Sequence, residues 1–418
     1  MSELKQRKLH PGQRLPRSEV IRNQRERLFG AAIAVVSEKG FEATTVADLL
    51  VGSGVSRSDF YRHFENKAEC VTAAAEALLE PTLSEVAALR ECSDPGQAET
   101  WFKRLLEGLA AQPAAARVCF VELHAVGERG EAVADRGFEE LARQVYEARA
   151  KLPGLERMPP EMLRALIGGL RQLLHKRLYR GRQDELQSLA PELWRWATSL
   201  APPPEPLQVP RRQRPPAAAR FQGYTPGERI ARAVAAVVAE KGYLAMSTDD
   251  IAARAAISLT TFYKHFADKR DAVLATLEMS GAQLMASAVP AARRAGGWEE
   301  GVRAIYETMC AYFVAEPAMA ELAMVGVHQA GPQALARRDR VIDSLTEMLA
   351  PGFEHNPEAP AVSAEAAGAS VYALMREQVR REGPQGLPAV VPLSTYVTLV
   401  GFVGSERACA VANGGGPG

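Results

Sequence analysis

Residues 34–41, Ala-Val-Val-Ser-Glu-Lys-Gly-Phe, return as residues 236–243, Ala-Val-Val-Ala-Glu-Lys-Gly-Tyr. Further along, Phe-Tyr-Arg-His-Phe at 60–64 returns as Phe-Tyr-Lys-His-Phe at 262–266. Residues 25–67 align with 227–269 at a constant offset of 202 without a gap, and 17 of these 43 positions are identical. Beyond this block the match weakens, but Pro113 and His124 recur as Pro317 and His328 at offset 204. The repetition predicts a domain duplicated in tandem, not a solenoid.

The composition is that of an ordinary soluble globular chain with room for two domains of about 200 residues. Of its 418 residues 47% are apolar and 24% charged, and 50 Lys and Arg balance 50 Asp and Glu. The five scattered Cys form no Cys-x-x-Cys pair, which argues against a disulfide scaffold or a cysteine zinc site and favours the reducing cytoplasm. The residues after Met1 are charged and include no apolar signal core, so secretion is not expected. No run of about 18 apolar residues occurs, so a membrane span is not expected either.

Helical patterns run through nearly the whole chain, so the predicted fold class is all-α. Apolar residues lie at i, i+4, i+7 and i+8 in both copies of the first repeated segment. They are Leu28, Ala32, Val35 and Val36 in the first copy, and Ile230, Val234, Val237 and Val238 in the second. Both stripes end in Lys-Gly, a cation followed by a residue suited to a left-handed cap. We find no strand-like alternation.

A short second and third helix follow in each copy. Thr45 with Asp48, and Ser247 with Asp250, have the spacing of capping boxes. Ser56 and Ser258 are expected to cap the third helix, and Val55 with Phe60, like Ile257 with Phe262, has hydrophobic-staple spacing. Phe60 and Phe64 share the inward face, which leaves hydroxyls, a phenol and basic groups pointing outward. Such a helix suits the major groove of DNA.

The run from Gly40-Phe41 through Phe60-Tyr61-Arg62-His63-Phe64 to Lys67 resembles the DNA-binding domain of TetR-family transcriptional regulators, and residues 240–269 resemble it equally. The resemblance covers about a fifth of the chain. It implies two tandem units, each a three-helix helix-turn-helix domain followed by a helical regulatory and dimerisation domain. The expected organisation is a basic tail at 1–19, helix-turn-helix domains at 20–67 and 225–269, regulatory domains at 68–200 and 270–412, a Pro/Arg-rich linker at 201–224 and a Gly-rich tail at 413–418.

The resemblance also implies which residues meet double-stranded DNA. In the first copy these are Thr45, Ser56, Arg57, Ser58, Asp59, Tyr61, Arg62, His63 and Lys67; in the second they are Ser247, Thr248, Ser258, Leu259, Thr260, Thr261, Tyr263, Lys264, His265 and Lys269. Lys67 and Lys269 are expected on phosphates. The copies differ at all of positions 57–59 and 259–261, and Asp59 stands where the family commonly has a small or neutral residue. We therefore expect an asymmetric operator.

Net positive charge is concentrated near the repeated domains. Residues 1–67 hold 12 Lys and Arg against 8 Asp and Glu, and residues 201–270 hold 11 against 6. This placement fits DNA, although solvated faces and tails explain the charge alone about as well. Two basic stretches are candidate minor-groove arms. They comprise Lys5, Arg7, Lys8, Arg14 and Arg17, and Arg211, Arg212 and Arg214.

By resemblance, the last two helices of each half form a four-helix interface. The candidates are residues 161–180 with 191–200 and 361–381 with 392–411, where Gly168, Gly169 and Gly368 permit close approach. Pairing of the two halves would make one chain a pseudo-dimer, while pairing between chains would make a homodimer. The proline-rich linker is expected to be an extended spacer spanning on the order of 60 Å, which allows many arrangements of the halves.

The second regulatory segment also offers candidates for a small apolar effector. Tyr306, Met309, Tyr312, Phe313 and Met324, with Met319 nearby, could line a cavity or be plain core. His124 and His328 each lack neighbouring ligands, so buried hydrogen-bonded histidines are favoured over a metal site. Cys119 and Cys310 are expected to be buried. No cofactor and no catalytic residue is predicted.

The leading hypothesis is thus a ligand-responsive DNA-binding repressor. The alternative keeps the fold but leaves one copy as a protein-interaction or structural module, with Asp59 marking the copy that has lost DNA binding. An enzyme is disfavoured because the sequence has no nucleotide-binding glycine loop and no convincing nucleophile–base set.

Overall fold

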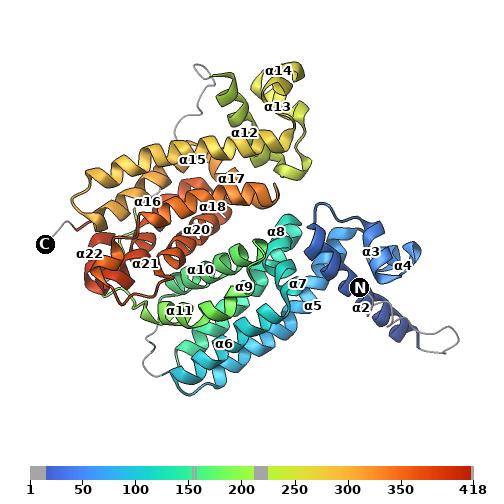
Figure 1. The fold of residues 1–418 in the computed structure, drawn as a ribbon, viewed down its shortest axis with the longest axis horizontal. Helices are drawn as coiled ribbons and strands as arrows, with labels where there is room; N and C mark the ends of the chain where they lie inside the picture. Colours follow the sequence, from blue (N-terminus) through green and yellow to red (C-terminus); the bar gives the residue numbers. More distant parts are fainter. Residues whose placement is uncertain (1–15, 153–154, 156–157, 211–224, 416–418) are drawn as a thin grey trace. The chain divides into compact units, whose positions relative to one another are not determined.

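The computed structural model describes residues 16–152, 155, 158–210 and 225–415, and these are helical without a β-strand (Figure 1). The predicted all-α class is therefore confirmed. The chain divides into two compact units. Unit 1 comprises Met1–Leu155 and Leu174–Pro191, and unit 2 comprises Glu156–Leu173 and Glu192–Gly418. The units do not coincide with the sequence repeat, because parts of residues 156–200 belong to unit 2.

The first half of the sequence forms a three-helix head, α2 to α4, followed by further helices that we call the body; α12 to α14 form the head of the second half. The elements are α2 Arg17–Lys39, α3 Val46–Ser53, α4 Arg57–His63, α5 Lys67–Ala87, η1 Ala88–Glu91, α6 Pro95–Ala111, α7 Pro113–Arg117, the π-helical η2 Val118–Glu122, α8 Leu123–Ala125, α9 Glu128–Arg149, α10 Pro160–Tyr179 and α11 Glu185–Ser199. In unit 1 the core joins head and body, because Leu28, Phe60 and Phe64 pack in one cluster with Leu123 and Val133.

The second half repeats this order. Its elements are α12 Pro226–Ala245, α13 Thr248–Ala255, α14 Leu259–His265, α15 Lys269–Arg294, α16 Trp298–Ala315, α17 Pro317–Met324, η3 Gly326–His328, α18 Pro332–Glu347, α19 Gly352–His355, α20 Ser363–Glu382, η4 Pro384–Val390, α21 Val391–Val403 and α22 Ser405–Ala412. In unit 2, α15 packs along α16 and α18, while α17 packs on α12 of the head. The last predicted interface segment, 392–411, is broken at Gly404, whose φ of 79° ends α21.

One helix crossing occurs in both units, but the glycine that permits it lies on opposite helices. In unit 1, a Cβ on Gly137 of α9 would lie 3.3 Å from Leu79 Cδ1 of α5. At the matching places in unit 2, the glycine is Gly281 on α15, and its Cβ would lie 2.6 Å from Val341 Cγ2 of α18. Each crossing therefore holds one large residue opposite one glycine, with the glycine on the other helix. The close packing of protein interiors explains why the exchange is reciprocal.

Both Lys-Gly helix ends adopt positive φ, though not the predicted left-handed helical cap. Gly40 has φ 81° and ψ 157°, and Gly242 has φ 75° and ψ 158°. Because ψ is extended, the chain leaves the first helix directly towards the second. Glycine is favoured at both positions, since L side chains rarely adopt such φ values.

The described part of the linker makes contacts that the expectation of an extended spacer did not include. Tyr396 Oη donates to the carbonyl of Ala201 at 2.8 Å, and the Gln208 amide donates to Asn413 Oδ1 at 2.8 Å. Asn413 Nδ2 also donates to the carbonyl of Pro206 at 3.3 Å. Residues 201–208 are thus fixed along α21 and α22, because proline-rich backbone carbonyls that make no helix accept bonds from neighbouring side chains. Linker residues 211–224 lie outside the described residues.

Two helical ranges, Lys269–Arg294 and Pro384–Val403, are long and apolar enough to cross a membrane by length and composition alone. Two further helices, Trp298–Ala315 and Pro317–His328, meet at a bend of 111°. They would count as a third such span if the pair formed one span that is broken at the bend. Of the two apolar windows, 44% and 72% are buried inside the structure. These helices do not support the exclusion of a membrane span that the lack of an uninterrupted apolar run of about 18 residues suggested.

Candidate nucleic-acid interface and effector cavity

The third helix of each head is anchored by two aromatic rings. Phe60 is fully buried and Phe64 nearly so, with ring centroids 5.9 Å apart. Phe262 and Phe266 repeat this arrangement at 5.8 Å. Ser56 and Ser258 cap α4 and α14 by accepting from the amides of Asp59 and Thr261, as predicted. The inward rings and the caps fix which face of α4 and α14 remains outside.

The second helix of each head starts with the predicted capping box. Thr45 and Asp48 bond each other reciprocally, as do Ser247 and Asp250. A lysine at the end of the preceding helix adds a bond that the sequence prediction did not include. Lys39 Nζ lies 2.6 Å from Asp48, and Lys241 Nζ lies 2.5 Å from Asp250. These lysines and the capping bonds lower the pKa of both carboxyls to about 2.

The turn between the second and third helices differs between the copies. Gly54 takes the left-handed conformation, with φ 63° and ψ 23°. In the second head the same place is Ala256, at φ 53° and ψ 50°. An alanine with positive φ carries a steric cost that glycine avoids. The second head therefore contains a local backbone strain that the first one lacks.

The outward faces of α4 and α14 present most of the residues predicted to meet DNA. Tyr61 is 48% exposed and Tyr263 is 55% exposed. The other exposed members are Ser56, Arg57, Ser58 and Arg62 in the first head, and Ser258, Leu259, Thr260, Lys264 and His265 in the second, with Thr45 exposed and Asp59, Ser247, Thr248 and Thr261 half-buried. Thr248 Oγ1 lies 3.4 Å from Tyr263 Oη, which connects the second and third helices of that head.

Lys67 and Lys269 do not have the geometry expected of phosphate contacts. Lys67 Nζ donates to the carbonyls of Phe41, Glu42 and Thr44 at 2.9, 3.1 and 2.7 Å. Lys269 Nζ donates to three carbonyls of residues 243, 244 and 246 at 3.2, 3.4 and 3.0 Å. Because an ammonium has three donors, each lysine is fully used in joining the fourth helix to the loop before the second. Partial burial lowers the pKa of Lys67.

The outward faces of α4 and α14, which we call the reading faces, differ in charge. Asp59 pairs with Arg62 on the same helix at 2.7 Å and also accepts from the Ser56 hydroxyl at 2.7 Å. In the second head Thr261 replaces the acid, and Lys264 is exposed without an ion pair among the described residues. Asp59 therefore neutralises a basic group of the first head, whereas the matching lysine of the second keeps its charge available.

The histidines at the end of α4 and α14 also differ. His63 is half-buried, and its Nε2 lies 2.9 Å from Gln24 Oε1 of α2. Burial, with the charge of Arg25, lowers the pKa of His63. His265 is exposed. Gln24 was not among the sequence candidates, since its place beside His63 depends on how α2 crosses α4.

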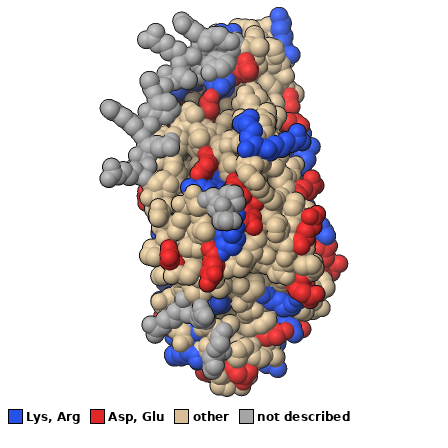
Figure 2. Space-filling model, turned by 90° about the vertical axis from the view of Figure 1, so that its left-hand side faces the viewer, with Lys and Arg blue, Asp and Glu red and all other residues tan. Residues whose placement is uncertain are grey.

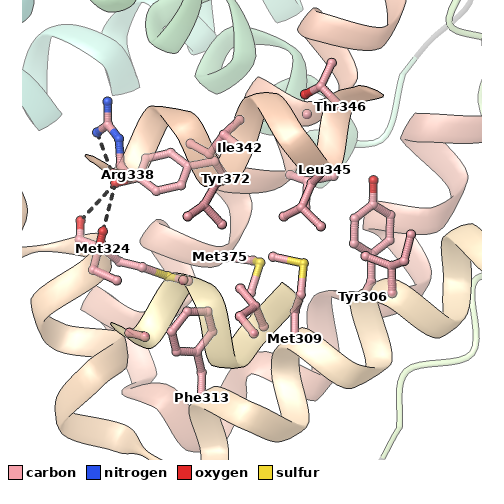
Figure 3. A pocket seen from close by; sticks show the side chains of 18 of the residues that line it. Tyr306, Met309, Phe313, Met324, Arg338, Ile342, Leu345, Thr346, Tyr372 and Met375 are labelled. Carbon is pink, nitrogen blue, oxygen red and sulfur yellow. Dashed lines mark hydrogen bonds between the residues drawn. The ribbon is translucent and has the colours of Figure 1, made fainter. Parts of the chain in front are cut away.

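Unit 2 contains a mainly apolar cavity of about 80 Å³ (Figure 3). Tyr306, Met309, Phe313 and Met324 line it, together with Met375. Tyr312 does not line it, because it lies about 100° around α16 from Phe313; its hydroxyl is 2.9 Å from that of Ser280. Met319, although buried, is also absent from the lining.

One charged side chain that the sequence did not single out, Arg338, lines the cavity. Its Nε and Nη2 donate to Asp339 Oδ1 at 3.0 and 2.7 Å, and its Nη1 donates to Tyr372 Oη at 3.2 Å. His328 Nε2 lies 3.4 Å from both Arg338 Nη1 and Tyr372 Oη. The charge is thus compensated within the wall. Burial and the bond to Thr398 act oppositely on Tyr306, and burial prevails, raising its pKa to about 12.

The other sequence candidates lie inside the units. His124 is buried, but it is not isolated: its Nδ1 lies 3.0 Å from Glu131 Oε1, and its ring is 6.2 Å from that of His175. No cluster of three metal-ligating side chains occurs among the described residues. Cys310 is buried and Cys119 half-buried, and burial raises the pKa of both thiols to about 12.

The positions of the basic arms are only partly described. Arg17 is the first residue of α2, and the other arm residues lie outside the described ranges. On the face drawn in Figure 2, Lys and Arg are interspersed with Asp and Glu, as the zero net charge suggests. The three-helix heads and their polar third helices define a DNA-binding protein of the helix-turn-helix class.

Comparisons with known proteins agree with this class. The family model described as bacterial regulatory proteins of the tetR family matches residues 28–74 and again 230–276. An uncharacterized HTH-type transcriptional regulator, YvdT, of Bacillus subtilis (strain 168) is 36% identical over 61 residues, which are 15% of this chain and 31% of that protein. The chain therefore matches about a third of the length of this curated relative.

Two solved structures are also similar. The fatty acid degradation regulator FadR from Bacillus halodurans is 18% identical with a TM-score of 0.37, covering 41% of this chain and 97% of that one. The TetR family transcriptional regulator PfmR from Thermus thermophilus is 24% identical with a TM-score of 0.35, covering 43% and 100%. The chain therefore contains two copies of the domain that defines the tetR family of bacterial regulatory proteins.

Proposed function

We propose that the chain is a repressor whose two heads read one asymmetric operator, and whose DNA affinity responds to a small apolar effector bound in unit 2. The carrying observation is the pair of unlike reading faces. Asp59 neutralises Arg62 in the first head, while Lys264 in the second, beside Thr261, has no ion pair with any residue that the structure describes. Different donors on the two recognition helices favour different base edges in the two half-sites. Such a regulator acts on chromosomal DNA in the cytoplasm.

The packing inside unit 2 supports pairing of the two halves on one chain. Within this unit, a Cβ at Gly168 would lie 2.7 Å from Ala373 Cβ, and one at Gly169 would lie 3.1 Å from the Ser370 amide. Arg195 Nη2 also donates to the carbonyl of Glu358 at 3.0 Å. Segments of α10 and α11 thus pack against the region of α20, as the pseudo-dimer requires. Pairing between two chains is the competing arrangement.

The cavity favours an uncharged occupant. Its lining is mostly aliphatic, aromatic and thioether carbon, and Arg338 is already paired with Asp339. A carboxylate placed there would have to displace Asp339 from a buried ion pair, which is unfavourable. An apolar molecule loses nothing of this kind and gains burial of its surface. The effector class we propose is therefore small, apolar and uncharged.

The test replaces one exposed tyrosine at a time with alanine: Tyr61→Ala, Tyr263→Ala, and the control Tyr146→Ala. Tyr146 is 38% exposed on α9, outside both heads. An operator is first selected from genomic fragments bound by the intact chain. We expect each head variant to weaken binding by about tenfold, a loss of roughly 1.4 kcal/mol, and the control to leave it unchanged.

Two other outcomes of this test are informative, and the stoichiometry is measured separately. Loss in Tyr263→Ala alone favours the alternative in which the first copy is an interaction or structural module. No loss in either head variant rejects sequence-specific binding by these helices. Light scattering of the complex gives the stoichiometry: one chain per operator supports the pseudo-dimer, with half-site centres about 34–36 Å apart, and two chains per operator support a homodimer.

A further inference from the structure

The first head is joined to its body by a buried carboxylate. Glu122, the last residue of η2, accepts from the Phe41 amide with Oε2 at 2.9 Å, directly after the end of α2. Its other oxygen pairs with Arg117 Nε at 3.2 Å. Arg117 in turn donates to the carbonyls of Leu178 and Tyr179 at 3.2 and 3.3 Å. The latch, Glu122 with Arg117, therefore ties the head to two parts of unit 1.

In the second half, the offset that matches His124 with His328 places Gly326 where the first half has Glu122. A Cβ on Gly326 would lie 2.5 Å from Val238 Cγ1 of α12. The backbone of η3 therefore rests directly on the first helix of the second head. A glycine cannot supply a carboxylate at this position, so the contact of η3 with α12 consists of close packing. An ion pair between α12 and the rest of unit 2 lies elsewhere, where Arg232 Nη2 donates to Glu316 Oε1 at 2.7 Å.

The same segment forms part of the cavity wall. Ala323 and Met324, at the end of α17, line the cavity and precede Gly326 by two or three residues. Tyr372 Oη lies 3.5 Å from the carbonyl oxygen of each. Arg376 Nε donates to the Met324 carbonyl at 3.2 Å. Because Tyr372 also lines the cavity, an occupant would touch both the end of α17 and the side chain that holds it (Figure 3).

We infer that the cavity of unit 2 controls the second head alone, so that its effector converts a two-headed DNA binder into a one-headed one. This inference rests on the proposed function. An occupant larger than the free space displaces Met324 or Tyr372, and the close contact of Gly326 with Val238 transmits the shift to α12, since packed interfaces change arrangement rather than deform. Glu122 and Arg117 keep the first head in its bound orientation, and the chain stays on half of its operator.

Because the effector is unidentified, a side chain serves as the occupant. Ala323→Leu adds three carbons at the cavity wall, and Leu345→Phe fills the cavity from α18 and serves as a second variant if the first does not fold. Cys119→Leu is the matched control, since offset 204 places Cys119 where the second half has Ala323. Circular dichroism verifies the fold of each full-length variant.

The readout is hydroxyl-radical footprinting of the full chain on its selected operator. We expect wild type and Cys119→Leu to protect two half-sites, and the filled variants to protect one, with about a tenfold loss of overall affinity. In the filled background, Tyr61→Ala is expected to abolish the remaining footprint and Tyr263→Ala to change nothing.

Loss of both half-sites in the filled variants, of neither, or of the Tyr61-dependent one alone overturns the inference. A wild-type chain that protects no pair of half-sites contradicts the proposed function instead, so the two failures are distinguishable.

Discussion

Asp59 sets the electrostatic difference between the heads at the scale of one residue. We expect Asp59→Thr to release Arg62 for phosphate contact, because the 2.7 Å ion pair is removed. Affinity of the first head for its half-site should rise, and the slope of log K against log salt should steepen by about 1. Electrophoretic mobility shifts at several salt concentrations measure both.

The reciprocal change Thr261→Asp is the control for this prediction. It places an acid beside Lys264 and should weaken the second head and flatten its salt slope. Equal slopes for wild type and Asp59→Thr would mean that the ion pair with Asp59 does not alter the contribution of Arg62 to phosphate binding.

Lys67 illustrates the limit of sequence reasoning. We expect Lys67→Met to destabilise the first head by about 2–3 kcal/mol, because hydrogen bonds from a charged donor to three carbonyls are lost. The salt slope of DNA binding should stay constant. Thermal unfolding and salt titration are compared with Lys264→Met, which should show the opposite pattern. A reduced slope for Lys67→Met would restore the phosphate role.

Whether an interaction could be predicted from the sequence depends on how far apart its partners lie along the chain. The capping boxes and inward rings are local, with partners three or four residues apart, and they were predicted correctly. The carbonyls that bind Lys67 lie 23 to 26 residues away, so periodicity could not reveal them. Tyr312 precedes Phe313 by one residue and so lies about 100° away from it around α16, where its hydroxyl meets Ser280. Helical periodicity alone therefore separates Tyr312 from the cavity residues, whereas which apolar residues border a cavity depends on packing between helices.

At the scale of elements, the capping boxes predict an acid-sensitive start of the second helices. Asp48 and Asp250 have folded pKa values of about 2, below the unfolded value of about 4. Their contribution to stability is complete above the unfolded pKa and disappears as pH falls through 2. Asp48→Asn with Asp250→Asn should therefore reduce the decline in urea stability between pH 4 and pH 2. An unchanged decline would exclude these carboxyls as its source.

The glycine crossings predict a double-mutant cycle. Gly281→Leu places a side chain against Val341, where a Cβ alone would lie 2.6 Å from Cγ2, and should cost about 1–3 kcal/mol by overpacking. Val341→Gly in the same chain reproduces the large-and-small pairing of Leu79 with Gly137 and should recover most of the loss. Urea unfolding of the two single variants and the double variant gives the coupling energy. Additive losses would mean that the two crossings are not equivalent.

At the scale of the whole molecule, Gly169 tests the pairing of halves. Gly169→Leu cannot fit where a Cβ already approaches the Ser370 amide to 3.1 Å. We expect this variant to lose affinity for the two-half-site operator by at least about tenfold, while binding to an isolated half-site persists. Gly108→Leu controls for the loss of a helical glycine, because Gly108 is exposed on α6 and a Cβ there meets nothing within 4 Å. Equal losses on both DNAs would indicate unfolding of a head instead.

The packing of the α10 segment within unit 2 also has a consequence for dose. When a repressor is assembled from two separate subunits and these are dilute, its operator occupancy depends on the square of the subunit concentration. Two subunits must associate before they bind the two operator halves tightly. In the proposed pseudo-dimer that encounter has already taken place on one covalent chain, so occupancy would rise in direct proportion to the number of copies in the cell. A handful of molecules then suffices for a graded, first-order response without a threshold.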